Sequence, residues 1–261
     1  MPTPHYLQST RLREAGFRHA FFSRVGGVST GAYRSLNFSF AVGDAPERVQ
    51  RNFDLAAEAL EVPSRKIIFL SQVHGRGVRR LQGAEVQDTS LFDEGDALVS
   101  ASSEVACAVR TADCLPILIG DPASGAVAAI HAGWRGLVAN VIGAAVAALA
   151  ETARARPEGF IAAIGPHISQ AAFEVSPEVA AELAAASAAK DALDERAGRR
   201  PHVRLSSIAR AQLANAGLRT TEIEDVGGCT VGDPELYFSY RRDGKASGRH
   251  LHAIVARPPQ R

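Results

Sequence analysis

The sequence has few cysteines and almost no net charge. Its 261 residues include three cysteines, an odd number without the spacing of a disulfide framework, which favours free or metal-bound thiols in a reducing, cytoplasmic setting. The 29 lysines and arginines nearly balance 28 aspartates and glutamates, and the formal charge of +1 gives no indication of nucleic-acid binding. With 46% hydrophobic residues, the composition is that of an ordinary globular protein.

Long apolar runs are also missing. The longest candidate, Leu137 to Ala150, is rich in alanine, contains Gly143 and is shorter than a membrane span. The segment from Met1 to Gly16 has no apolar core before Leu12, so a signal peptide is not expected either. We therefore expect a protein with no membrane partner.

Two apolar runs in the middle of the chain predict a β-hairpin. The runs are Leu115–Ile119 and Ala126–His131, and the segment 121–125, Asp-Pro-Ala-Ser-Gly, has the composition of a turn between them. Cys114 stands at the start of the first strand, and His131 ends the second. Antiparallel pairing would therefore bring this thiol and this imidazole to the same edge of the sheet.

Helical periodicity and strand-like runs alternate irregularly along the chain. Apolar spacing predicts helices over 46–60 and 137–154, and Ser176 followed by Pro177 indicates a further helix start. Further strands are expected over 66–71, 96–99, 105–110, 160–164, 223–226, 236–240 and 251–256. Because strict βαβ alternation is absent and no linker or repeat is visible, we predict an α+β fold with mixed sheets and a single domain, residues 1–261.

Three segments carry a candidate metal site: Ser71–Gly75, Ala112–Pro116 and His131–Gly136. Two neutral imidazoles and one thiolate are a good ligand set for Zn²⁺, and three protein ligands leave a fourth position open, as in catalytic zinc sites. His74, Cys114 and His131 are the expected ligands. The gaps between them are longer than those of zinc fingers, so the fold must bring them together.

Cys114 also allows a second interpretation, because a cysteine with one histidine is a nucleophilic hydrolase arrangement. Cys107, inside an apolar run, is expected to be an inert buried residue. For Asp113 two interpretations stay open: it orients a ligand histidine through the second ring nitrogen, or it forms a turn at the start of the strand.

Arg24 and Arg135 are the two expected anion-binding residues. Arg24 adjoins Gly26-Gly27, whose backbone N–H groups could cradle oxygens, and Arg135 stands at the predicted start of a helix. The segment Tyr240-Arg241-Arg242 is a third candidate. Each of these arginines is also open to a structural role as an ion-pair partner.

The three site segments, together with others in order along the chain, resemble the signature of the YfiH family. That family is also described as the multicopper polyphenol oxidase or laccase domain and as purine nucleoside phosphorylase. The other matching segments are Phe22–Arg24, Gly26–Ser29, Ser35–Asn37, Val42–Asp44, Asp96–Val99, Gly165–Ile168, Phe173–Val175, Cys229–Thr230, Phe238–Arg242 and Gly248–Arg249. One departure is Ala171-Ala172, which stands where many relatives carry cysteines.

The resemblance implies a four-layer αββα fold, a monomer or weak homodimer, and a metal held by His74, Cys114 and His131. It also implies phosphorolysis of adenosine, inosine, guanosine and S-methyl-5′-thioadenosine, with adenosine deamination as a second activity. Purine nucleosides and phosphate are then the partners, and Arg24 and Arg135 are the candidate phosphate-binding residues. Zn²⁺ is the expected cofactor and Cu²⁺ the alternative.

Two other functions remain open at this point. One is a hydrolase that edits peptidoglycan precursors with Cys114 as nucleophile, and the other is a copper polyphenol oxidase resembling laccases. A single set of two histidines and one cysteine is too small for the several copper sites that four-electron oxygen chemistry requires. Deamination usually needs a carboxylate as proton shuttle, and Glu174 is the nearest candidate in the matching segments.

Overall fold

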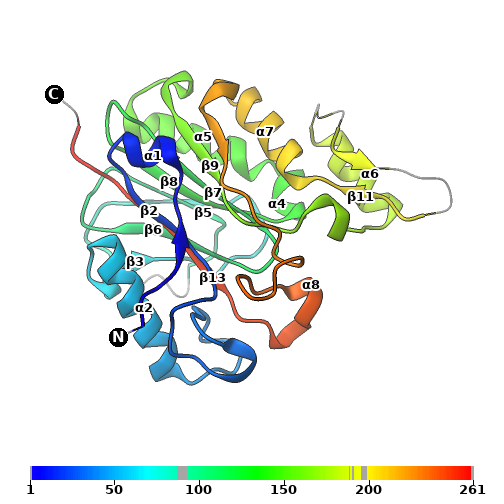
Figure 1. Cartoon of the computed structure of the whole chain (residues 1–261). Helices are drawn as coiled ribbons and strands as arrows, with labels where there is room; N and C mark the ends of the chain where they lie inside the picture. The colour runs from blue at the N-terminus through cyan, green and yellow to red at the C-terminus, as the bar shows by residue number, and fades with distance from the viewer. Residues whose placement is uncertain (1, 87–92, 188, 190, 195–198, 260–261) are drawn as a thin grey trace.

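The computed structural model describes residues 2–86, 93–187, 189, 191–194 and 199–259 (Figure 1). Two β-sheets pack face to face, and helices cover their outer faces. In the described residues, no helix has the length and apolar character needed to cross a bilayer.

The first sheet has five strands and unites the two ends of the chain. In spatial order these are β1 (Tyr6–Leu7), β2 (Arg18–Phe22), β13 (His250–Val255), β6 (Ala106–Thr111) and β3 (Ile67–Ile68). The strands β2 and β13, blue and red in Figure 1, run side by side and antiparallel. The β3 strand pairs with β6 in parallel, so the sheet is mixed.

The second sheet has six strands and carries most of the predicted site. In spatial order these are β12 (Ile223–Asp225), β9 (Ile161–Ile164), β7 (Leu115–Gly120), β8 (Val127–Ala132), β5 (Ala97–Ser100) and β4 (Val78–Leu81). It too is mixed, because β12 with β9 and β4 with β5 are parallel pairs. A separate two-stranded pair comprises β10 (Leu193–Asp194) and β11 (His202–Val203).

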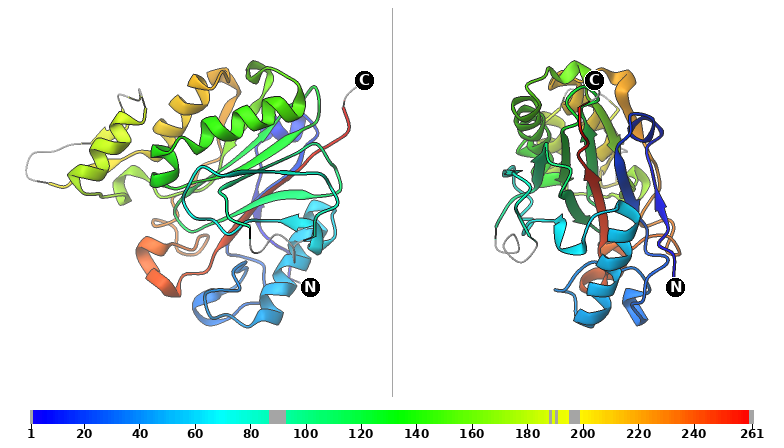
Figure 2. Two further views of the ribbon diagram at one scale, coloured as in Figure 1. Left: turned by 180° about the vertical axis from the view of Figure 1, so that it is seen from behind. Right: turned by 90° about the vertical axis from the view of Figure 1, so that its left-hand side faces the viewer.

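Helices form the two outer layers. The α-helices are α1 (Thr10–Glu14), α2 (Pro46–Leu60), α4 (Trp134–Val138), α5 (Val141–Ala153), α6 (Pro177–Ala185), α7 (Leu205–Asn215) and α8 (Tyr240–Asp243). The 3₁₀ turns are η1 (Gly31–Tyr33), η2 (Ser64–Lys66), η3 (Pro157–Gly159), η4 (Gln170–Ala172), η5 (Thr220–Glu222) and η6 (Gly244–Ala246). Figure 2 shows α5 lying across the six-stranded sheet, where it packs on β5 and β8.

Three apolar clusters fill the interfaces between the four layers. One joins α5, α7 and their neighbours to the outer face of the six-stranded sheet. A second joins α2 to the outer face of the five-stranded sheet. The third lies between the sheets and includes Phe21, Ile254 and Leu118. These clusters confirm the predicted α+β class and the αββα layer order.

Several predicted elements are confirmed. The central hairpin forms with Pro116 opposite His131, because the turn at 121–125 folds as its composition indicates. The helix over 46–60 has those bounds, and Ser176 caps α6 by accepting a hydrogen bond from the Val179 N–H.

Two predicted elements are wrong. The single helix over 137–154 is divided into α4 and α5, because Asn140 adopts a left-handed conformation and its side chain caps α5 through the Gly143 N–H. No strand forms over 236–240. There the Phe238 N–H donates to His250 Nε2, and the Ser239 hydroxyl caps α8, so side chains take the place of a neighbouring strand.

Gly165 provides a test of how tightly the sheets pack. A Cβ at this position would overlap the Phe21 ring of the first sheet and lie 2.9 Å from Pro116 Cγ of the second. We expect Gly165→Ala to lower the free energy of unfolding by about 1–3 kcal/mol, as overpacked cores do. Gly159→Ala is the matched control, because no atom lies within 4 Å of a Cβ there. Urea denaturation measures both, and equal midpoints would contradict this packing.

Candidate active site

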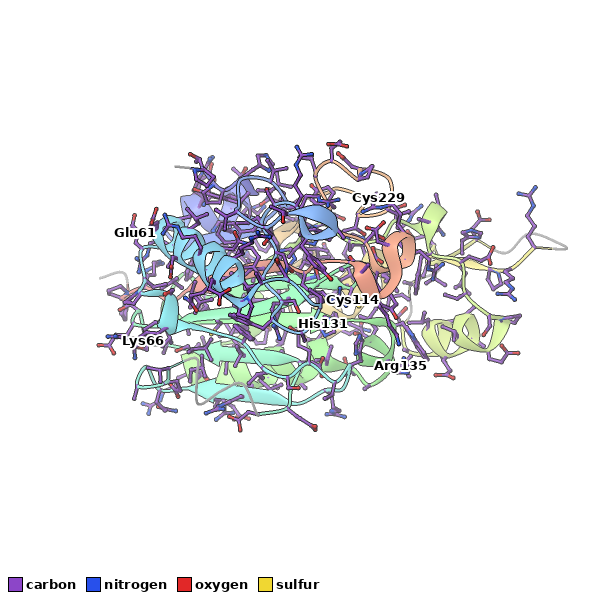
Figure 3. All side chains as sticks on the ribbon, turned by 90° about the horizontal axis from the view of Figure 1, so that it is seen from below. Glu61, Lys66, Cys114, His131, Arg135 and Cys229 are labelled. Carbon is purple, nitrogen blue, oxygen red and sulfur yellow. The ribbon has the colours of Figure 1, made fainter. Side chains whose placement is uncertain are left out.

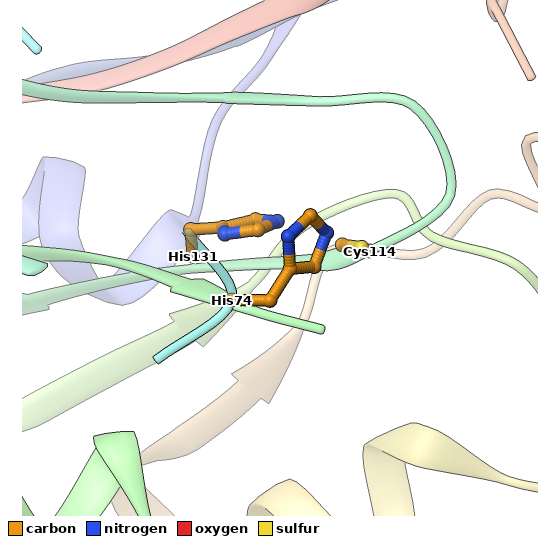
Figure 4. Close-up of side chains that lie close together, drawn as sticks. All are labelled: His74, Cys114 and His131. Carbon is orange, nitrogen blue, oxygen red and sulfur yellow. The ribbon is translucent and has the colours of Figure 1, made fainter. Parts of the chain in front are cut away.

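The three predicted metal ligands lie together beside the start of β7 and the end of β8, two central strands of the six-stranded sheet (Figure 4). Their ligand atoms all lie within 4.8 Å of one another, and the two imidazole centroids are 4.8 Å apart. His131 is buried on β8, Cys114 is half-buried directly before β7, and His74 is exposed in the loop between β3 and β4. The hairpin therefore supplies two of the three groups, and a separate loop supplies the third.

A buried carboxylate, Asp96, holds two of these groups in place. Its Oδ1 lies 2.8 Å from His131 Nδ1 and accepts the His74 N–H at 3.0 Å. Its Oδ2 accepts the N–H of Gly75 at 2.7 Å. Because an ionised carboxylate only accepts, His131 Nδ1 is the donor, and Nε2 is the nitrogen left for a metal. Asp96 thus orients a ligand histidine, a role that the sequence had left open for Asp113.

The loop carrying His74 is held by two further contacts. His74 has φ 58°, a left-handed conformation that side chains rarely adopt, and the hydrogen bonds to Asp96 stabilise it there. Gln72 Nε2 donates to the Arg110 carbonyl and Gln72 Oε1 accepts the Arg110 N–H, both at 2.8 Å. Gly133 leaves the space that these ligands need, since a Cβ there would lie 2.8 Å from His74 Cδ2 and 3.1 Å from Cys114 Sγ.

The electrostatics favour a thiolate in the metal-free site. Burial alone would raise the pKa of Cys114, but the charge of His131 and hydrogen bonds from both histidines bring it to about 6. Burial alone would lower the pKa of His131, but Cys114 and Asp96 raise it to about 9. Burial likewise opposes ionisation of Asp96, yet its hydrogen bonds hold the pKa of that carboxyl below its ordinary value. The site is therefore a thiolate–imidazolium pair beside a carboxylate.

These residues fit a zinc ion by their chemistry. A thiolate and two imidazoles are zinc ligands, and the carboxylate behind His131 is the usual partner of a zinc-binding histidine. The three ligand atoms lie within 4.8 Å of one another, close enough for one ion to be bound by all of them. The exposed His74 side chain has the most room to move.

A cavity of about 640 Å³ opens beside the three groups, within the range of small-molecule sites. Phe173 and Tyr240 give it aromatic surface, and Ser71 and Thr111 add hydroxyl groups. Four arginines line it: Arg110, Arg135, Arg241 and Arg249. The cavity therefore combines a ligand set for a metal with several cationic groups.

Of the two expected anion-binding arginines, the structure brings only Arg135 to this cavity. Arg135 is the second residue of α4, and its guanidinium lies 4.3 Å from the Trp134 ring centroid. Arg24 lies in a separate hollow, where it donates to the carbonyls of Arg34 at 2.7 Å and Pro234 at 2.8 Å. Because Arg24 lines this other hollow and bonds to its carbonyls, it is not placed to hold a phosphate beside the three groups.

Two acidic candidates, Asp113 and Glu174, are engaged in other contacts. Asp113 Oδ1 accepts the Thr230 hydroxyl and Oδ2 accepts the Arg241 N–H, both at 2.6 Å, so Asp113 stabilises local structure. Glu174 does not line the cavity, and its carboxylate lies 3.9 Å from Arg200. These contacts remove Glu174 from the set of candidate proton shuttles.

The three cysteines differ in their surroundings. Cys107 is fully buried, as predicted, and burial raises the pKa of its thiol. Figure 3 shows Cys114 next to His131, with Cys229 well apart from them. Cys229 Sγ contacts the Ser169 hydroxyl at 3.1 Å.

The sequence reasoning missed four residues of the site: Asp96, Gln72, Arg110 and Arg249. Asp96 was visible as the acidic residue at the start of a predicted strand, and Gln72 stands within a site segment. Arg110 lies within the largely apolar strand β6, and Arg249 directly precedes β13. What the sequence could not supply was that these positions converge.

Asp96→Asn should weaken zinc binding about 10–100-fold, because the neutral amide cannot hold both His131 and the His74 loop as the carboxylate does. Competition with a chromophoric chelator measures the affinity. Asp121→Asn is the control: Asp121 is equally buried but stabilises the hairpin turn at the far end of β7. Equal zinc affinity in both variants would contradict the role of Asp96.

In metal-free protein, the rate at which iodoacetamide labels Cys114 should rise through pH 6 and level off above about pH 7. The thiolate is the reactive form, and the pKa of Cys114 is about 6. Cys107 should stay unlabelled and bound zinc should protect Cys114, both measured by peptide mass spectrometry. A Cys114 rate still rising at pH of about 8.5, where ordinary thiols titrate, would argue against the ion pair.

Comparison with known proteins identifies relatives over most of the chain. The family model described as multi-copper polyphenol oxidoreductase laccase matches residues 18–257. Purine nucleoside phosphorylase YfiH of Escherichia coli (strain K12) is 39% identical over 230 residues, or 87% of this chain and 88% of that protein. Purine nucleoside phosphorylase SCO2081 of Streptomyces coelicolor is 40% identical over 238 residues, or 90% of this chain and 93% of that protein.

Solved structures share the whole fold. YlmD from Geobacillus stearothermophilus has a TM-score of 0.88 and 29% identity, with 97% of this chain and 98% of that chain covered. Protein NMB0706 of Neisseria meningitidis has a TM-score of 0.83 and 34% identity, with 97% and 99% covered. The fold, the matched residues and these relatives together show that the chain belongs to the YfiH family, whose family model is described as multi-copper polyphenol oxidoreductase laccase.

Proposed function

We propose that this protein is a zinc-dependent purine nucleoside phosphorylase. Its substrates are orthophosphate and a purine nucleoside: adenosine, inosine, guanosine or S-methyl-5′-thioadenosine. The observation that carries the proposal is the set of His74, Cys114 and His131 beside a cavity lined by four arginines. Curated relatives named purine nucleoside phosphorylase support it. We expect the protein to act in the cytoplasm as a monomer or weak homodimer.

The cavity offers a suitable surface for each part of such a substrate pair. Its volume of about 640 Å³ is enough for a nucleoside with phosphate, and Phe173 and Tyr240 provide aromatic faces for a purine. Its arginines provide donors for a phosphate. In phosphorolysis a phosphate oxygen forms a bond to the ribose anomeric carbon, the bond to the purine nitrogen breaks, and the base takes up a proton.

The roles of the protein groups follow from their contacts. His74, Cys114 and His131 would hold the zinc, and Asp96 fixes the orientation of His131. Zinc supplies Lewis acid chemistry when bound. The arginines orient the phosphate and reduce its repulsion with other negative groups.

Adenosine deamination is proposed as a second activity on the family resemblance. A carboxylate shuttle is normally required for that reaction. Glu174 lies outside the cavity, and both Asp113 oxygens accept hydrogen bonds from Thr230 and Arg241. The proton for deamination must therefore come from another group.

A second candidate is a hydrolase that edits peptidoglycan precursors with Cys114 as nucleophile. One observation favours it: Cys114 pairs with His131, which in turn hydrogen-bonds Asp96, as in a Cys-His-Asp triad. A hydrolase of this kind would work without metal. Turnover of such precursors by chelator-treated protein would therefore favour the hydrolase over the phosphorylase.

A copper polyphenol oxidase is disfavoured by the number of ligand groups. In the part of the chain that the structure describes, His74, Cys114 and His131 form the one cluster of at least three candidate ligands. Copper accepts this ligand set too, so electron paramagnetic resonance of metal-replete protein distinguishes Cu²⁺ from Zn²⁺.

Purified protein should contain about one equivalent of zinc, as a single three-ligand site allows. Each of the variants His74→Ala, Cys114→Ala and His131→Ala should lose most of this zinc, because each removes one of three ligands. Elemental analysis measures the zinc content. Cys229→Ala is the control, since Cys229 contacts Ser169 and not this cluster. Full zinc in all three ligand variants would refute the metal site.

Release of free base from inosine or adenosine should require phosphate and yield ribose 1-phosphate. Omitting phosphate should stop base release but leave deamination of adenosine to inosine running, because water is its other substrate. Chromatography of reactions with and without phosphate measures both products. Base release that continues at the same rate without phosphate would show a nucleoside hydrolase instead.

A further inference from the structure

Two guanidinium groups face the cavity from neighbouring strands of the five-stranded sheet. Arg110 lies on β6, and Arg249 directly precedes β13. The register pairs His250 with Thr111, so the two arginines stand at the same end of adjacent strands. Cys114 and His131 come from the other sheet. Two of the cationic groups of the cavity therefore come from the five-stranded sheet, and two of the metal ligands come from the hairpin of the six-stranded sheet.

Within the described part of the chain, neither arginine forms an ion pair with a carboxylate. The ion pairs among the described residues are all formed by other cationic side chains. None of them joins Arg110 or Arg249 to an aspartate or glutamate within 4.0 Å. Arg110 Nε is buried without a hydrogen-bond partner, and Arg110 Nη1 reaches the Phe38 carbonyl at a long 3.4 Å. Leaving a buried charged donor unpaired is costly.

Both guanidinium groups are nevertheless held in position. Arg110 lies 4.0 Å from the ring centroid of Phe69. Arg249 lies 5.6 Å from that of Tyr240, and its Nη1 donates to the carbonyls of Ser247 and Gly248. Packing against aromatic rings fixes a guanidinium while leaving edge N–H groups available. The two groups are thus organised before any ligand arrives.

The like charges of Arg110 and Arg249 indicate that the cavity suits an anionic ligand. Burial, and then the charge of Arg249, lower the pKa of Arg110 to about 10, so the group still carries its charge at neutral pH. Burial lowers the pKa of Arg249, although the negative charges of Cys114 and Asp113 act in the opposite direction. Two like charges held near each other in a cavity are stabilised by an anion between them.

We propose that Arg110 and Arg249 together bind a tetrahedral oxyanion on the wall of the cavity that the five-stranded sheet supplies. The occupant is a phosphate group, either inorganic phosphate or the phosphoryl group of a nucleotide. Its identification as the inorganic co-substrate rests on the proposed function. This site replaces Arg24, whose donors are bound to carbonyls in another hollow.

Isothermal titration of zinc-loaded protein with inorganic phosphate tests the site without requiring turnover. Arg110→Gln and Arg249→Gln should each weaken phosphate binding tenfold or more, because each loses a charge-assisted contact. Arg24→Gln is the matched control and should bind phosphate within twofold of wild type. Arg249→Lys should bind more tightly than Arg249→Gln, since it keeps the charge but loses the planar fork.

Circular dichroism and zinc content identify variants that fold. If folded Arg110→Gln and Arg249→Gln bind phosphate as wild type does, the site is refuted. If both lose phosphate binding while wild type cleaves no nucleoside, the oxyanion site stands and the phosphorylase proposal fails. A parallel titration with adenosine 5′-monophosphate separates the sources: binding of the nucleotide without binding of inorganic phosphate supports the site and overturns the co-substrate.

Discussion

The site depends on one buried carboxylate, because Asp96 connects the ligand histidine of β8 to the loop that carries His74. It hydrogen-bonds the imidazole of His131 and the backbone of the loop that carries His74. One oxygen therefore fixes the tautomer of one histidine and the unusual backbone conformation of the other. Without Asp96 the hairpin would still form, but the loop that carries His74 would be held only by the contacts of Ser71 and Gln72.

The four-layer architecture explains why one cavity can combine opposite chemistries. A thiolate and two arginines on a single small loop would form ion pairs and neutralise one another. Here Cys114 and His131 belong to the hairpin of the six-stranded sheet, whereas Arg110 and Arg249 stand on or beside strands of the five-stranded sheet, and all four line one cavity. Gln72 connects the two sides, because it hydrogen-bonds the Arg110 backbone from the loop that carries His74.

Local sequence patterns predicted what depends on local structure. The hairpin followed from its turn, and its pairing placed Cys114 near His131. The break at Asn140 and the loss of the strand over 236–240 depend on side-chain caps that periodicity does not detect. Arg24 was chosen for its neighbouring glycines, but distant carbonyls bind its donors. Asp96 and Arg110 gained their roles from strand order, which one sequence does not reveal.

The position of β13 has a consequence for how the protein is made. This strand lies between β2 and β6, so the five-stranded sheet cannot close until residues 250–255 have left the ribosome. Until then β2 and β6 each expose an unpaired edge, which other chains can bind. The six-stranded sheet needs nothing beyond β12 and can assemble earlier. The nascent chain therefore depends on protection of those edges during synthesis, and Arg249 joins Arg110 only when this last strand inserts.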